Sequence, residues 1–106
     1  MRWLLVGLLL IHGLIHVMGF LKAFGHAELP QLKGDISKPW GVAWLLATLL
    51  LIGCAVLVLG SWSPWRPWVV LALLVSQAVI VRAWQDAKAG TVANLLLLAS
   101  IFSRIP

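Results

Sequence analysis

Two histidines on the first apolar segment are the residues of this sequence best suited to chemistry. His12 and His16 lie four positions apart inside the uncharged run 3–21. Residues four apart share one helix face, so both imidazoles should project together, about 6 Å apart along the axis. The same stripe continues through Gly19 and Ala23, small residues that let a second helix approach closely. We therefore expect the pair to face the interior of a bundle, where an ionisable group suggests function.

Polar residues on later segments are expected at the level of this pair. If the first and third helices run parallel, counting from their outer ends places His12 near Ser76 and Gln77. The same count places His16 near Thr48 on the second helix. These five residues are predicted to form a small internal polar site for a ligand or a proton.

Four interpretations of this site remain open. A metal site is one, but His-Gly-Leu-Ile-His has Gly13 where zincins carry a glutamate, and no further histidine lies in any predicted span. A haem is the second, although a bis-histidine haem would need a second histidine that only a dimer could supply. A proton or small-solute path is the third, because imidazoles titrate near neutral pH. The sequence favours the fourth, neutral histidines that fix helix register, with no resident metal or cofactor.

A second polar cluster surrounds the connection between the third and fourth helices. Arg82 and Asp86 are one helical turn apart and are expected to pair. Thr91 can cap the next helix, and Asn94 stands at its third position, where a capping box carries Glu or Gln. Together with Lys88, a candidate ligand for a lipid headgroup, these residues are predicted to close the inner mouth of the bundle. A charged, capped turn is the simpler interpretation.

Composition indicates whether this chain folds in water or in a lipid bilayer. Its 106 residues are 62% hydrophobic and only 10% charged, against about 25% charged in soluble domains. A chain this short buries only a little over 60% of its unfolded surface, so lipid must cover the remaining apolar side chains. The net charge of +5 comes from eight scattered Lys and Arg residues, which argues against a nucleic-acid partner.

The apolar runs predict an all-α fold, a single-domain membrane bundle of four transmembrane helices spanning residues 1–106. The helices are expected at about 3–24, 40–60, 67–86 and 92–105. The first exceeds the 7 to 15 residues of a signal-peptide core, and the second matches the roughly 20 residues that cross a bilayer. The fourth, about 21 Å long, is short for a full crossing.

Tryptophans and loop charges predict how the bundle lies in the membrane. Because Trp prefers the interfaces, we expect two belts. One belt comprises Trp3, Trp62, Trp65 and Trp68, and the other Trp40, Trp44 and Trp84. The cations divide as Lys22, Lys33, Lys38, Arg82 and Lys88 against Arg2, Arg66 and Arg104. This five-to-three bias predicts that both termini lie outside.

Ordinary enzyme chemistry finds no support in the sequence. It contains no phosphate-binding glycine loop, nucleophile elbow or Cys-His dyad, and its three carboxylates are dispersed. We therefore predict a non-enzymatic membrane module. Its expected partners are the lipid bilayer and either a second copy of the chain or another membrane protein. Small-residue stripes such as Ala72 with Ser76 suit contacts within a chain or between subunits.

Several segments together resemble a known family. They are HGLIHVMGFLKAFG (12–25), AELPQL (27–32), ISKPWG (36–41) and DAKAGTVAN (86–94). This combination, spread over nearly the whole chain, resembles a family of bacterial four-helix inner-membrane proteins without an established activity. The resemblance implies a multi-pass inner-membrane location and four helices. Size and topology are also similar to the DoxX-like proteins, whereas the first-helix glutamate of small multidrug transporters has no counterpart.

Overall fold

The chain is all-helical in the computed structural model, which describes residues 2–30, 32–61 and 64–103. The described residues contain no β-strand, so the predicted all-α class is confirmed. The helices are α1 (Arg2–Ala23), α2 (Lys38–Leu59), α3 (Trp65–Arg82), α4 (Trp84–Ala87) and α5 (Gly90–Ile101).

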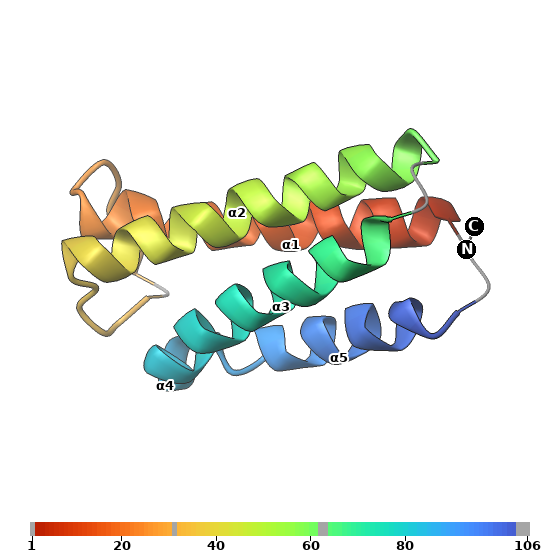
Figure 1. The fold of residues 1–106 in the computed structure, drawn as a ribbon. Helices are drawn as coiled ribbons and strands as arrows, with labels where there is room; N and C mark the ends of the chain where they lie inside the picture. The colour runs from red at the N-terminus through yellow and green to blue at the C-terminus, as the bar shows by residue number, and fades with distance from the viewer. Residues whose placement is uncertain (1, 31, 62–63, 104–106) are drawn as a thin grey trace.

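The four longer helices form an elongated bundle with extents of 40 × 21 × 19 Å. Figure 1 shows α1 and α2 side by side and antiparallel, with α3 and α5 forming a second antiparallel pair beside them. α1 packs against α2, α2 against α3, α3 against α5, and α5 against α1. Side chains from α1 and α3 can therefore meet at the centre, although these helices lie diagonally opposite.

Local sequence explains how the first two helices end and begin. Gly25 adopts a left-handed φ of 71°, which glycine reaches without steric cost. The turn lets the N–H of His26 reach the carbonyl of Leu21, at 2.9 Å, and so closes α1. α2 starts at Lys38 with Pro39 in its first turn, where the missing proline N–H removes no hydrogen bond.

Three helices, α1, α2 and α3, are long and apolar enough to cross a membrane. Their apolar side chains point outward as well as inward. Exposed examples on three helices are Leu4, Leu14, Val56 and Leu74. A helix that is apolar all round fits a lipid environment, because water would penalise its outer face. The membrane character predicted from composition is thereby supported. The fourth long helix, α5, has 12 residues and a length of about 18 Å.

The predicted third and fourth helices differ from the structure at their ends. The expected helix 67–86 is two helices, since α3 ends at Arg82 and Ala83 leaves the helical region with φ −113° and ψ 38°. α5 ends at Ile101 rather than continuing to 105, and positions 104–106 lie outside the described residues. Arg66 on α3 donates to the carbonyls of Ile101 and Ser103, at 2.9 Å each, and so caps this helix end.

The tryptophans occur near the two ends of the bundle, but not all of them face lipid. Trp3, Trp68 and Trp84 are exposed, as an interfacial belt requires. Trp44 and Trp65 are instead buried, with 4% and 0% of their surface exposed. These two indoles fill the space between helices, so their side chains contact protein rather than the outer surface of the bundle. Trp62 lies outside the described residues.

Candidate functional site

A buried polar cluster joins three helices in the middle of the bundle. His12 and His16 come from α1, Ser76 from α3 and Asn94 from α5, and all four side chains are at most 6% exposed. The two imidazole rings meet edge to face, with centroids 4.4 Å apart. We refer to these four residues as the polar network.

His16 is held by one bond at each ring nitrogen. Its Nδ1 lies 2.9 Å from the backbone carbonyl of His12, an acceptor only, so Nδ1 carries the proton and donates. Nε2 of the neutral ring must then accept, and the Ser76 hydroxyl lies 2.8 Å away. Ser76 therefore donates its single proton to His16, and this tautomer follows from the geometry.

Asn94 connects the rest of the polar network. Its Oδ1 lies 2.8 Å from Nε2 of His12 and can only accept, so His12 carries its proton on Nε2. Its amide nitrogen donates to Ser76 Oγ and to Gln77 Oε1, both at 3.0 Å. Gln77 in turn donates to the Thr91 hydroxyl at 3.1 Å. The two histidines are consequently opposite tautomers, and the chain of bonds extends to the start of α5.

Nδ1 of His12 is the one ring nitrogen of the pair to which no described residue is hydrogen-bonded. Gly90, the first residue of α5, lies beside this ring. A Cβ at position 90 would stand 2.9 Å from Ile80 Cδ1 and 3.5 Å from His12 Cε1. The absence of a side chain therefore lets the first turn of α5 approach His12 closely, and it brings Asn94 within bonding distance.

The side chain of Trp44 covers one side of the polar network. Its ring centroid lies 5.2 Å from that of His16. It fits there because Gly19 has no side chain, since a Cβ at that position would overlap the indole. Thr48, predicted to lie near His16, is buried and donates to the carbonyl of Trp44 at 3.2 Å. It thus bonds within its own helix and is no member of the polar network.

The predicted hairpin residues separate into different surroundings. Arg82 and Asp86 form no ion pair, so their expected pairing is wrong, because the break at Ala83 turns α4 away from the axis of α3. Asp86 instead accepts the N–H of Gly34 in the first loop, at 2.8 Å. The backbone N–H groups of Gly34 and then Lys33 lower the pKa of Asp86 below its ordinary value. Lys88 is exposed.

The position of the Asn94 side chain was not predicted from the sequence. Asn94 was assigned to the mouth of the bundle as part of a cap, yet its side chain is buried against His12. A usable signal was present, because Asn94 is an amide side chain within an apolar segment, as Gln77 is on the preceding segment. Polar side chains at such positions tend to hydrogen-bond across helices.

The polar network does not offer two opposed ligands for a haem or a full ligand set for a transition metal. Both nitrogens of His16 are engaged, and the rings of His12 and His16 project from one helix rather than from opposite sides of a cavity. Across the described residues, no three His, Cys, Asp or Glu side chains are grouped so as to hold a metal ion. The remaining donors, Ser76 and Asn94, are weak ligands for the metals that imidazole prefers.

Comparison with protein-family models, curated proteins and solved structures finds no match for this chain. The interpretation of the site therefore rests on its geometry.

Proposed function

We propose that this chain is a non-enzymatic, four-span module of the bacterial inner membrane. In this proposal, the polar network around His12 and His16 holds α1, α3 and α5 in one register. The observation that carries it is the mutual pairing of donors and acceptors. Each polar hydrogen assigned to His12, His16, Ser76 and Asn94 has an acceptor within 3.0 Å.

A paired network of this kind suits a structural role. Between membrane helices, apolar contact gives little specificity because lipid tails are equally apolar, whereas a hydrogen bond forms in one register only. Sliding α5 by one residue would remove Asn94 from His12 and Ser76 together. The proposed role of the network is therefore to select one arrangement of the bundle, which a partner or a second copy would then recognise.

A fourth crossing is supported by the end of α5. Arg66, in the first turn of α3, binds the carbonyls of Ile101 and Ser103, so the chain has returned to the end of the bundle where α3 begins. A helix of about 18 Å is shorter than the hydrocarbon core of a bilayer. A full crossing by α5 therefore requires that the bilayer thins locally or that the last part of the span is not helical. The resemblance of residues 12–25 and 86–94 to bacterial inner-membrane proteins, together with the loop charges, supports the location and external termini.

A double-mutant cycle tests the structural role. Ser76→Ala, His16→Leu and the double variant are unfolded in mixed detergent and lipid micelles, with circular dichroism as the readout. We expect an interaction free energy of about 0.5–2 kcal/mol between the two positions. Leu74→Ala, an exposed change on the same helix, serves as the matched control. Additive effects of Ser76→Ala and His16→Leu would refute a register-fixing role for this bond.

Proton transfer is a second candidate function, and the open Nδ1 of His12 favours it. An imidazole that donates through Nε2 while its Nδ1 lone pair is available can take up a proton on one side and release one on the other. Ser76 and His16 continue the path from His12, with Ser76 Oγ 3.4 Å from His12 Nε2.

Proton flux into liposomes, read by an internal pH-sensitive dye, distinguishes the two candidates. Under the second candidate, wild-type protein conducts protons and His12→Gln abolishes the flux, because glutamine keeps a donor for Asn94 but cannot titrate. His26→Gln in the exposed first loop is the control and should conduct normally. A wild-type protein that conducts no protons eliminates this candidate and leaves the structural role standing.

A further inference from the structure

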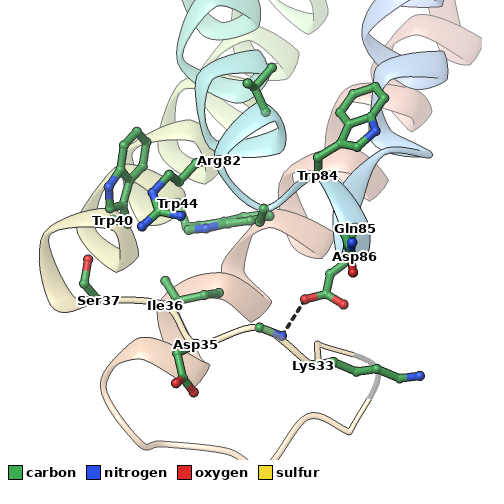
Figure 2. Close-up of a pocket in the computed structure, with 13 residues that line it drawn as sticks. Lys33, Asp35, Ile36, Ser37, Trp40, Trp44, Arg82, Trp84, Gln85 and Asp86 are labelled. Carbon is green, nitrogen blue, oxygen red and sulfur yellow. Dashed lines mark hydrogen bonds between the residues drawn. The ribbon is translucent and has the colours of Figure 1, made fainter.

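A cavity of about 670 Å³ opens at the α4 end of the bundle, separate from the polar network. Figure 2 shows its walls, which come from the first loop, the start of α2, the end of α3 and α4. Trp44 contributes to the lining and also contacts His16, so its indole separates the cavity from the network. The volume falls within the range typical of small-ligand pockets.

Arg82 is the cation of the lining that points into this cavity, whereas Lys33 is directed away from it. Its guanidinium points into the space between Trp40 and Trp44 in Figure 2, and its central carbon lies 5.9 Å from the Trp40 ring centroid. Among the described residues, no carboxylate lies within ion-pair distance of Arg82. A guanidinium beside an aromatic ring can bind an oxyanion when its N–H donors form no ion pair with a carboxylate.

The other charged residues of the lining leave this guanidinium unopposed. Asp86 already accepts the N–H of Gly34, at 2.8 Å. Figure 2 shows the carboxylate of Asp35 and the amine of Lys33 directed away from Arg82. This end of the chain carries five Lys or Arg residues against three Asp or Glu, so the local field also favours an anion.

The position of the cavity indicates an amphiphilic ligand. It lies where α2 begins and α3 ends, two helices long and apolar enough to cross a membrane. Trp40 and Trp84 stand on its two sides in Figure 2, and Trp84 is 48% exposed, as expected for side chains at the headgroup level. A ligand here would place a charged group against Arg82 and an apolar part along the indoles.

We propose that this cavity binds the phosphate headgroup of an anionic lipid, with Arg82 on the phosphate and Trp40 and Trp84 beside the glycerol and the first methylenes. The inference does not rest on the proposed function, because no residue of the polar network lines the cavity. A lipid headgroup and a free phosphate ion would both present a phosphate oxyanion to Arg82, so the test must distinguish these two sources.

Lipid binding to the detergent-purified full chain tests the proposal, with adducts counted by native mass spectrometry. We expect phosphatidylglycerol to bind, phosphatidylcholine to bind at least about tenfold more weakly, and Arg82→Gln to lose about tenfold in phosphatidylglycerol affinity. Lys88→Gln is the matched control, because it removes the same charge at the same end from an exposed residue outside the lining. It should bind like wild type.

Equal losses in Arg82→Gln and Lys88→Gln, or equal binding of the two lipids, would overturn the proposal in favour of unspecific surface attraction. Displacement of the lipid by millimolar inorganic phosphate would support the oxyanion site and identify free phosphate as a competing source. If Arg82→Gln does not fold, Ile36→Glu places a negative charge in the cavity wall without altering a helix. Undiminished phosphatidylglycerol binding by that variant would refute the site.

Discussion

Nε2 of His12 lies 2.8 Å from Oδ1 of Asn94, and this bond joins positions 82 residues apart in the chain. It links the first long helix to the last, and it determines the protonated nitrogen of His12. Through the amide nitrogen of Asn94 the same residue also reaches Ser76 and Gln77 on α3. A single side chain thus connects three helices.

Replacement of Asn94 by leucine should destabilise the bundle by about 1–2 kcal/mol. The change preserves approximate volume but leaves the His12 N–H and the Gln77 carbonyl without their partner in an apolar interior. Unfolding by sodium dodecyl sulfate, followed by circular dichroism, measures the loss. Leu95→Ala, a change at the neighbouring exposed position, is the control and should cost less than about 0.5 kcal/mol. If both variants unfold alike, Asn94 does not hold α1, α3 and α5 together.

The two histidines should be opposite neutral tautomers. His16 is expected to carry its proton on Nδ1 and His12 on Nε2, because the carbonyl of His12 and the amide oxygen of Asn94 can only accept. Nitrogen-15 NMR of the imidazole rings in bicelles distinguishes the tautomers directly, and His16→Asn assigns the signals. Two rings protonated at Nε2 would contradict the assigned direction of the Ser76 to His16 bond.

Gly19→Ala should destabilise the protein by about 1–3 kcal/mol, because the new methyl group would overlap the indole of Trp44. The Trp44 ring would have to move away from His16, so near-ultraviolet circular dichroism should change as well. Gly7→Ala is a control on the same helix, since a Cβ there meets no atom within 4 Å. That variant should be neutral or stabilised by up to about 1 kcal/mol. Equal effects at positions 7 and 19 would argue against the close packing of Trp44 on α1.

The contact between Asp86 and the first loop should weaken in acid. Hydrogen bonds from the N–H groups of Gly34 and Lys33 lower the pKa of Asp86 below its ordinary value of 3.8. Because the folded pKa is the lower one, the contact is fully present above the ordinary value and is lost as pH falls through the folded value. The Gly34 amide signal in NMR should therefore titrate with a midpoint below 3.8.

Asp86→Asn should abolish that titration, whereas Asp35→Asn, a change in the same loop, should leave it in place. A midpoint at or above the ordinary value in wild-type protein would show that the Asp86 carboxylate is not held by the loop backbone.

Composition and periodicity were sufficient to predict the helical class, the membrane environment and the approximate helix positions. Long uncharged runs admit few alternatives, since backbone groups in hydrocarbon must bond within a helix. The spacing of His12 and His16 likewise predicted their common face, because four residues make about one turn whatever surrounds them. The break at Ala83 escaped prediction, since neither glycine nor proline stands there to indicate it.

Only the tertiary structure decided which polar residues meet. Asn94 was predicted to be a capping residue because it follows Thr91 near a helix start. Thr48 was predicted to lie beside His16 because the two residues have the same depth along their helices. Depth along an axis does not specify rotation about it, and rotation depends on how small residues such as Gly19 and Gly90 let particular helices approach. Local sequence sets a helix and its length, whereas the partner of each buried side chain follows from packing among helices distant in the chain.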